Sequence, residues 1–516
     1  MNHTDIEKWK EELLEFKEKT EAFDSGEMNK GAYKRFSGRF GTYAQRSGTE
    51  HMLRLRMPAG RVTKERLAFT ADMIRKYQID RLHFTTCQTI QLHDMSKNCV
   101  YEIMEAALNA GIITIGGGGD YPRNVMCSPL SGVERGEYFD VLPWAERAGD
   151  YLLDFINEEK MPRKLKVGFS NSPKNESHAT YRDLGFAARA DGKFDVYSAG
   201  GLGNNPLFGV KVAEGIEPGQ ILYYIKAMWL TFLTYGNYEN RGKARSRYMQ
   251  EKLGGAEKYK EAFLKKLQEA FAEGEDLTVC AKAKPMTKTG DGTSIEDARV
   301  IAQKQDGLYT VVWHPIGGQP APERFCALSD ALAEIEAAEL RLSPDETAYV
   351  VNLTGGEAKK VLDLTDDSAK TQFEMSVSCI GAGICQIGLR DSQALLRACI
   401  HAVREAGLPD RALPQIHISG CPSSCGTHQT GKIGFRGAFQ MIDKKPCATF
   451  VLFAGGNDRQ GDEAMGRELG MISEEKIPEF LVALGGKVAE SGMDYETWIC
   501  KNPDGVERLA EGYLLN

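Results

Sequence analysis

His51-Met-Leu-Arg-Leu-Arg-Met-Pro-Ala-Gly-Arg61 begins a structural unit that the chain contains twice. Its apolar residues alternate with polar ones, which predicts a strand. We expect a helix after it, then a strand segment over residues 80–93 and a second helix over 97–110. A unit of this kind is too small to bury both faces of its sheet alone.

The second copy spans residues 309–367. It begins Tyr309-Thr-Val-Val-Trp-His-Pro-Ile-Gly-Gly318, and we expect a helix over 327–339 and a strand over 348–354. Strand, turn, helix and strand therefore recur in the same order in two β-α-β units. We expect the two units to stabilise each other by pairing.

The segments that follow the two units also correspond. Residues 121–131 follow the first unit and residues 376–385 follow the second, and each is succeeded by a helix and a strand. The chain therefore resembles a duplicated gene product. Only the second copy carries a set of four cysteines, which suggests that one copy holds a metal cluster while the other does different work.

Composition limits the class of protein. The chain has 516 residues, of which 42% are hydrophobic and 26% charged, with a net charge of −8. This is ordinary globular composition, and the acidic balance and the lack of a helix-turn-helix or basic stripe argue against nucleic-acid binding. We find no apolar run near the roughly 18 residues of a membrane helix and no signal peptide. Twelve cysteines without such a signal favour a reducing cytoplasm.

The four cysteines of the second copy have the spacing of metal ligands. Cys379 and Cys385 form a C-x5-C pair, and Cys421 and Cys425 form a C-x3-C pair. A [4Fe–4S] cluster needs four such thiolates. Zinc sites more often use shorter spacing in both pairs, and disulfides need an oxidising compartment. Four buried free cysteines remain the simplest alternative.

A basic segment, Met161-Pro-Arg-Lys-Leu-Lys166, has a pattern that suits an anion. Residues two apart on a strand face the same side, so Lys164 and Lys166 are expected to project together. Two ammonium groups in one pocket attract a small oxyanion and can supply protons to its oxygens. Taken alone, the segment could equally be an edge strand with solvated lysines.

Taken together, these motifs resemble those of the siroheme-containing nitrite and sulfite reductases, over nearly the whole chain and in the same order. The resemblance implies an α+β fold with pseudo-twofold internal duplication. Two ferredoxin-like half-domains would pair, and two larger α/β domains would bind siroheme and the cluster. It divides the chain into an N-terminal helical extension (1–47), half-domain 1 (48–115), a siroheme and substrate domain with a helical insert (116–296), half-domain 2 (297–368) and a cluster and siroheme domain (369–516).

The resemblance also implies roles for individual residues. The four cysteines Cys379, Cys385, Cys421 and Cys425 would hold a [4Fe–4S] cluster, and Cys425 would also bridge to the siroheme iron. Substrate binding and catalysis would involve Arg123, Lys164 and Lys166. Further residues expected to contact the cofactors are Thr85, Thr86, Gln88, Gln91, Asn124, Gly201 and Gly203.

The chain departs from the family pattern at two places. The family reads Thr-Thr-Arg-Gln where this chain has Thr85-Thr86-Cys87-Gln88, so one fixed positive charge of the substrate pocket is missing. In and after the cluster motif, relatives often carry Asn-Gly and then Arg, where this chain has Ser423-Ser424 and then Thr427-His428. This second departure concerns the cofactor contacts and leaves the four cluster ligands in place.

The expected activity is the six-electron reduction of sulfite to sulfide in the cytoplasm. The sequence has no G-x-G-x-x-G in a β-α-β unit, so electrons would come from a ferredoxin or a flavoprotein. In the family, Lys-x-Lys at positions 164 and 166 is typical of sulfite enzymes, whereas Cys87 favours nitrite by removing charge. Nitrite reduction to ammonia is thus the alternative. A non-catalytic iron–sulfur electron-transfer protein and a zinc-stabilised binding module are the alternatives of another class.

Overall fold

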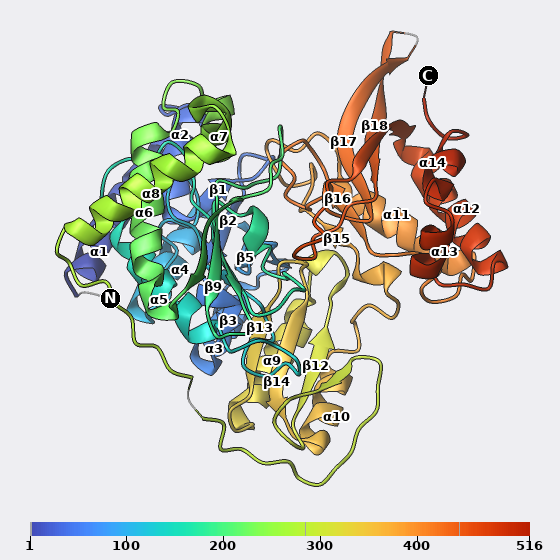
Figure 1. Cartoon of the computed structure of the whole chain (residues 1–516), viewed down its shortest axis with the longest axis horizontal. Helices are drawn as coiled ribbons and strands as arrows, with labels where there is room; N and C mark the ends of the chain where they lie inside the picture. The colour runs from blue at the N-terminus through green and yellow to red at the C-terminus, as the bar shows by residue number, and fades with distance from the viewer. Residues whose placement is uncertain (1–2, 284, 443, 516) are drawn as a thin grey trace.

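The computed structural model describes residues 3–283, 285–442 and 444–515, which form four β-sheets surrounded by helices. In Figure 1 the first copy, coloured blue to green, packs beside the second, coloured yellow to red. No helix in the described ranges is both long and apolar enough to span a bilayer.

The two smaller sheets repeat one strand order. Their strands are β1 (Thr42–Ala44), β2 (His51–Leu55), β3 (Arg61–Val62), β4 (Leu82–Phe84), β5 (Ile90–Met95), β11 (Val300–Ala302), β12 (Tyr309–Trp313), β13 (Glu339–Leu342) and β14 (Ala348–Leu353). The orders are β1-β2-β5-β4 and β11-β12-β14-β13-β3, with antiparallel neighbours throughout. Because β3 of the first copy pairs with β13 of the second, the predicted pairing of the two copies is confirmed.

The two larger sheets also correspond strand by strand. Their strands are β6 (Met126–Cys127), β7 (Val167–Ser170), β8 (Leu184–Ala188), β9 (Phe194–Ser198), β10 (Val210–Ile216), β15 (Val377–Ser378), β16 (Ile416–Ser419), β17 (Ile433–Ile442), β18 (Lys445–Ala454) and β19 (Arg467–Ser473). The orders are β10-β9-β8-β7-β6 and β15-β16-β17-β18-β19. In each sheet the first three strands in the sequence run parallel and the last two are antiparallel additions. The predicted duplication and the α+β class are therefore confirmed.

The helices cover the sheets in the same repeated pattern. They are α1 (His3–Asp24), α2 (Lys30–Ser37), α3 (Lys64–Tyr77), α4 (Lys97–Asn109), α5 (Leu142–Asp154), α6 (Ile221–Tyr235), α7 (Tyr248–Leu253), α8 (Ala256–Ala272), α9 (Pro322–Glu334), α10 (Gly355–Leu364), α11 (Ser392–Glu405), α12 (Ile477–Glu490), α13 (Tyr495–Lys501) and α14 (Gly505–Ala510). Helix α3 of the first copy packs against its counterpart α9. The helix predicted over 327–339 has the wrong bounds. Helix α9 begins at Pro322, since proline is favoured in the first turn of a helix, and Glu339 already belongs to β13.

One continuous core joins the two small sheets. The ring of Phe84 lies 5.6 Å from that of Trp313 and 6.3 Å from that of Phe325, measured between centroids. All three side chains are fully buried. Truncation of such a ring to alanine typically lowers stability by about 3–5 kcal/mol, so neither copy is expected to be stable alone.

The connection between the copies includes residues 281–295, whose composition predicts a linker that forms an exposed, basic loop. The described residues there form no helix or strand, as expected of a linker. Lys288, however, is buried, and its ammonium group donates to the Glu357 carboxylate at 2.6 Å and to the Asn352 carbonyl at 2.8 Å. The linker is therefore tied to the second half-domain. The five-part division of the chain stays a prediction, and β1 lies inside the range assigned to the N-terminal extension.

Candidate active site

The four cysteines lie at one edge of the second large sheet. Cys379 directly follows β15, and Cys421 follows β16 after a single glycine. These strands are parallel neighbours, so their carboxyl ends meet at the same edge. Cys385 and Cys425 lie further along the same two loops. The fold therefore brings the two cysteine pairs to adjacent loops.

Backbone and hydroxyl donors surround the first cysteine. The Gly420 amide donates to the Cys379 sulfur at 3.2 Å, and the Ser392 hydroxyl lies 3.2 Å from that sulfur. Gly420 cannot be replaced easily, since a Cβ there would lie 2.5 Å from the Arg390 carbonyl oxygen. Burial and the nearby Cys425 raise the pKa of the Cys379 thiol to about 12. A metal is therefore needed to keep this sulfur as a thiolate at neutral pH.

The arrangement of the thiols suits a cluster. Cys425 interacts electrostatically with each of the other three thiols, those of Cys379, Cys385 and Cys421. Within the described ranges, no three His, Cys, Asp or Glu side chains converge on one point as ligands of a single ion would. In a [4Fe–4S] cluster each thiolate binds a different iron, so the ligands surround the cluster.

Lys164 and Lys166 lie side by side next to Cys425. They belong to an extended segment just before β7, where Leu165 bridges to Pro122 and is buried while both lysines are partly exposed. Burial, together with the charges of Lys166, Arg245 and Arg123, holds the pKa of Lys164 well below its ordinary value. Burial also lowers the pKa of Lys166. Ammonium groups with lowered pKa give up protons more readily near neutral pH.

Arg123 completes the predicted cationic group. Its guanidinium donates to the carbonyl oxygens of Gly117 at 2.6 Å and Gly119 at 2.8 Å. The Nε atom is buried and has no hydrogen-bond partner within the described residues. Burial and the nearby Arg54 lower the pKa of Arg123 to about 10. A buried, incompletely paired guanidinium of this kind is suited to an anionic ligand.

Three further arginines, which the sequence did not single out, join this group. The charges of Arg182 and Arg245 both help to lower the pKa of Lys166. Arg245 also pairs with the carboxylate of the buried Asp183 at 3.0 Å. Asp183 also accepts from the Lys166 backbone nitrogen at 2.8 Å, and so positions the lysine. Arg247 is 4% exposed, yet its Nη1 has no hydrogen-bond partner within the described residues. The only sequence signal was the Arg245-Ser246-Arg247 cluster, in the domain for which a helical insert is predicted.

The turn between β4 and β5 holds several predicted residues. The Thr85 hydroxyl lies 2.7 Å from that of Thr89, and the Thr86 hydroxyl donates to the Cys425 carbonyl at 2.9 Å. Gln88 is fully buried, and its amide exchanges hydrogen bonds with the backbone of Cys127 at 2.8 Å. Asn124 donates to the carbonyls of Cys87 and Gln88 at 3.1 Å. Their contacts with a cofactor stay predictions.

The glycine-containing loop over residues 200–206 lies against the loop that carries Cys421 and Cys425, which we call the cluster loop. Gly203, with φ of +105°, exchanges hydrogen bonds with Gln429 at 3.1 and 2.8 Å. A Cβ at this position would lie 3.6 Å from the Pro422 carbonyl oxygen and 3.4 Å from Arg247. Gly201 exchanges backbone hydrogen bonds with Leu207 at 2.9 Å. The loop thus brings backbone close to the loop of Cys421 and Cys425. It also brings backbone close to Arg247, whose Nε and Nη2 donate to the Asn205 and Asn204 carbonyls and whose Nη1 has no hydrogen-bond partner within the described residues.

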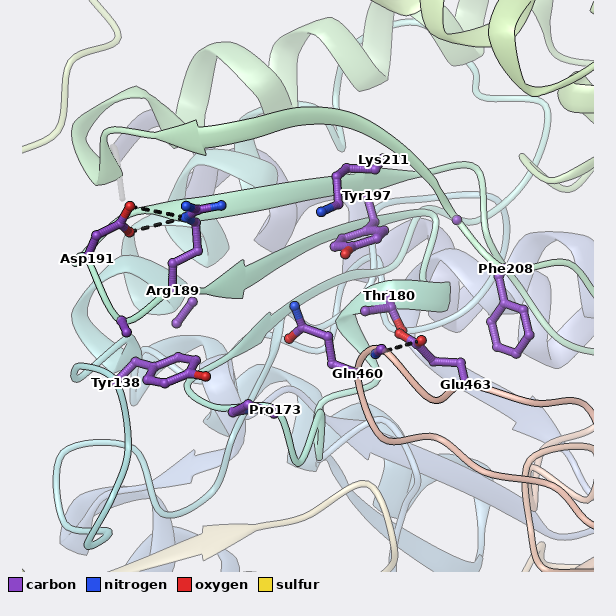
Figure 2. A pocket seen from close by; sticks show the side chains of 14 residues that line it. Tyr138, Pro173, Thr180, Arg189, Asp191, Tyr197, Phe208, Lys211, Gln460 and Glu463 are labelled. Carbon is purple, nitrogen blue, oxygen red and sulfur yellow. Dashed lines mark hydrogen bonds and ion pairs between the residues drawn. The ribbon is translucent and has the colours of Figure 1, made fainter.

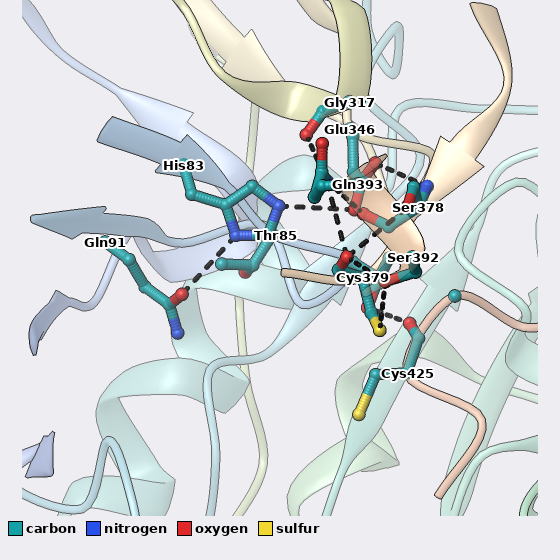
Figure 3. A network of polar contacts seen from close by, with 12 residues as sticks. His83, Thr85, Gln91, Gly317, Glu346, Ser378, Cys379, Ser392, Gln393 and Cys425 are labelled. Atoms are coloured by element: carbon teal, nitrogen blue, oxygen red, sulfur yellow. Dashed lines mark hydrogen bonds and ion pairs between the residues drawn. The ribbon is translucent and has the colours of Figure 1, made fainter. Parts of the chain in front are cut away.

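A buried polar network connects the first copy to the strand before Cys379 (Figure 3). His83 Nε2 lies 3.4 Å from a carboxylate oxygen of Glu346, and the Ser378 amide donates to the other at 3.0 Å. Gln91 lies at the near end of this network, 3.4 Å from His83 Nδ1. Burial raises the pKa of Glu346, although His83 opposes the shift. The position of β15 therefore depends on residues of the first copy.

A cavity away from the cysteines lies beside β8–β10. Its volume is about 710 Å³, and Figure 2 shows Tyr138, Tyr197 and Glu463 among the side chains that line it. None of the predicted site residues lines it. Its two basic residues are paired, since Arg189 bonds Asp191 and Lys211 bonds Asp195. The residues suited to redox chemistry are therefore those around Cys425.

Comparison with known families agrees with this site. Residues 118–271 match the family model described as the nitrite and sulphite reductase 4Fe-4S domain. Residues 43–110 match that of the nitrite/sulfite reductase ferredoxin-like half domain. The chain belongs to the siroheme nitrite and sulfite reductase family. It is therefore an oxidoreductase. Both matches lie in the first copy, whereas the four cysteines lie in the second.

Relatives and a solved structure cover most of the reductase. It is 26% identical over 490 residues to the sulfite reductase (NADPH) hemoprotein beta-component of Geobacillus kaustophilus, covering 84% of this chain and 82% of that protein. The equally named protein of Vibrio atlanticus is 26% identical over 86% of this chain and 81% of its own. The structure of the Mycobacterium tuberculosis NirA protein has the same fold, with a TM-score of 0.73 at 21% identity, covering 89% of this chain and 87% of that one.

The site residues fit the family's two cofactors, a [4Fe–4S] cluster and siroheme. Four cysteines on adjacent loops would provide the thiolates for the cluster. Siroheme is a polycarboxylate tetrapyrrole, and the unpartnered guanidinium atoms of Arg245 and Arg247 would supply the cationic donors that its carboxylates require. Because Gly201 and Gly203 have no side chains, the space beside Arg247 stays open for a ligand.

Proposed function

We propose that this reductase converts sulfite to sulfide with six electrons supplied by a separate ferredoxin or flavoprotein. The observation that carries the proposal is the pair Lys164 and Lys166 beside Cys425. Two adjacent cations suit an anion that can carry two negative charges better than one that carries a single charge. The names of the bacterial relatives, which are NADPH-linked hemoproteins, support sulfite as substrate.

Each group of residues has a distinct proposed task. Cys379, Cys385, Cys421 and Cys425 would hold the cluster, and Cys425 would also ligate the siroheme iron. When bound, these cofactors supply electron storage and an open coordination position at iron. Arg123 holds the oxygens of the anion in place. Lys164 and Lys166 donate protons to those oxygens, because their lowered pKa values make the ammonium groups better acids.

Nitrite is the second candidate substrate. It is favoured by Cys87, which stands where the family carries an arginine and so removes one positive charge. The decisive experiment is anaerobic turnover of both anions by the purified holoprotein with reduced viologen. We expect a higher kcat/KM for sulfite and stoichiometric sulfide, and a higher kcat/KM for nitrite would contradict the proposal.

A further inference from the structure

The first copy contains a residue that corresponds to each of the four cysteines. Ser128 directly follows β6, as Cys379 follows β15. Ser172 follows β7 after one residue, as Cys421 follows β16. The x5 and x3 spacings of the cysteines then lead to two glutamates. In chain order the four positions hold Ser128, Glu134, Ser172 and Glu176 in place of Cys379, Cys385, Cys421 and Cys425.

The hydrogen bonds at the first of these positions repeat as well. The Asn171 amide donates to the Ser128 hydroxyl at 3.1 Å. In the second copy the Gly420 amide donates to the Cys379 sulfur at 3.2 Å. A hydroxyl oxygen of the first copy therefore lies where a cluster sulfur lies in the second.

The turns of the loops also agree. The Glu134 amide donates to the carbonyl oxygen four residues earlier at 2.9 Å, and the Cys385 amide does the same at 2.8 Å. Asn175 and Ser424, each one residue before the last position, have left-handed φ values of +54° and +53°. The two loops of the first copy therefore keep the backbone conformation of the loops that carry the cysteines.

The change of residue types converts a soft ligand set into a hard one. Thiolates select iron–sulfur clusters, whereas carboxylate and neutral oxygens suit Ca²⁺ and Mg²⁺. Three side-chain oxygens of the second loop, Asn171 Oδ1, Ser172 Oγ and Glu176 Oε2, are buried without a hydrogen-bond partner within the described residues. Asn171 is 0% exposed and Ser172 is 5% exposed. Buried oxygens without partners are costly, and a cation would satisfy them.

The two loops meet at these side chains. The Asn171 side-chain nitrogen donates to one Glu134 carboxylate oxygen at 3.2 Å, and Lys174 forms an ion pair with the other. Glu176 interacts electrostatically with both Glu134 and Lys174. The Lys174 side chain is 60% exposed, whereas that of Glu134 is 6% exposed. An ammonium group from the surface therefore reaches a buried carboxylate that a metal cation can also bind.

We propose that the first copy binds one hard cation, of the class of Ca²⁺ or Mg²⁺, at the position that corresponds to the cluster. Glu134 and Glu176 would supply carboxylate oxygens, and Asn171 and Ser172 neutral oxygens, with water as the remaining ligands. Only two of these ligands are acidic, in keeping with the absence of three converging His, Cys, Asp or Glu side chains from the described ranges. The site does not depend on which anion the reductase reduces.

Anaerobic isothermal titration calorimetry of the desalted holoprotein with Ca²⁺ tests the site. It is run at about pH 8.5, because burial and Glu134 raise the pKa of Glu176 to about 8 and the ion must displace that proton. We expect one Ca²⁺ per chain, and roughly tenfold weaker binding in Glu134→Gln, which loses a carboxylate. Glu105→Gln, at an exposed position on α4, should bind as the wild type does. Equal affinities in the two variants would overturn the inference.

A gain of affinity distinguishes a cation site from a variant that merely folds poorly. Lys174→Met removes the ammonium group that competes for Glu134, so Ca²⁺ should bind roughly tenfold more tightly than to the wild type. The same titration with Mg²⁺ shows which of the two ions the site prefers. If neither ion binds to the wild type or to Lys174→Met, the first copy has no such site and the inference is wrong.

Discussion

The hydroxyl of Thr86 donates a hydrogen bond to the carbonyl oxygen of Cys425 at 2.9 Å, across 339 positions of sequence. Thr86 belongs to the β4–β5 turn of the first copy, next to Cys87, and Cys425 belongs to the cluster loop of the second. The cationic residues and the cysteines therefore form one site that neither copy contains alone. The second copy thus supplies the four cysteines and the first copy supplies the positive charges.

Lys166 is predicted to select sulfite. In Lys166→Asn we expect kcat/KM for sulfite to fall by roughly a hundredfold and that for nitrite by less, because a proton donor and a positive charge are both lost. Steady-state kinetics with reduced viologen measure both constants. Lys487→Asn, at an exposed position on α12, is the control. Equal losses for the two anions would show that Lys166 does not discriminate between them.

Cys421 is predicted to be a cluster ligand. Cys421→Ser should lower the iron and acid-labile sulfide per chain, because a hydroxyl replaces one of four thiolates. Cys500→Ser changes an exposed cysteine with no role in the proposed site and should retain both. Chemical analysis of anaerobically purified protein decides the matter. Full iron content in Cys421→Ser would remove this cysteine from the ligand set.

Arg247 is predicted to bind a carboxylate of the siroheme. Arg247→Gln removes a buried guanidinium with an unpartnered nitrogen, so we expect less siroheme per chain with the cluster retained. Extraction of the tetrapyrrole and its absorption measure the content. Arg459→Gln, whose side chain is 67% exposed, is the matched control. Equal siroheme content in the two variants would contradict the assignment.

Glu176 is predicted to make stability depend on pH. Burial and the nearby Glu134 raise the pKa of this carboxyl from 4.5 to about 8. Between these values the folded chain keeps a proton that the unfolded chain has lost. The resulting stability is fully present below pH 4.5 and disappears as the pH rises through 8.

Glu176→Gln should therefore raise Tm by about 2 °C above pH 8 and change it little near pH 4.5. Thermal unfolding at the two pH values measures the difference. Glu490→Gln at an exposed position of α12 controls for the loss of a charge. The same shift at both pH values would mean that Glu176 has an ordinary pKa in the folded protein.

Much of the fold could be predicted because its signals are local. Alternation in β2 and β12 and the recurring order of elements revealed the duplication, and the spacing of Cys379 to Cys425 indicated the cluster. Strand β3 could not be predicted, since two residues carry no periodicity and their partner, β13, lies far along the chain. Lys288 appeared to belong to a solvated linker because Glu357, its partner, is distant in sequence.

The cationic half of the site was only partly predictable for a similar reason. Lys164 and Lys166 stand two apart, so their shared side follows from local geometry. Arg245 reaches Lys166 through Asp183, in an arrangement made by the fold of the larger sheet that no spacing encodes.

The most direct test of the account is the visible absorption spectrum of the anaerobically purified holoprotein, recorded together with its turnover of sulfite by reduced viologen. We predict siroheme and cluster bands and the formation of sulfide. Cluster absorption without siroheme bands, with no turnover of sulfite or nitrite, would contradict the account and leave an iron–sulfur electron-transfer protein.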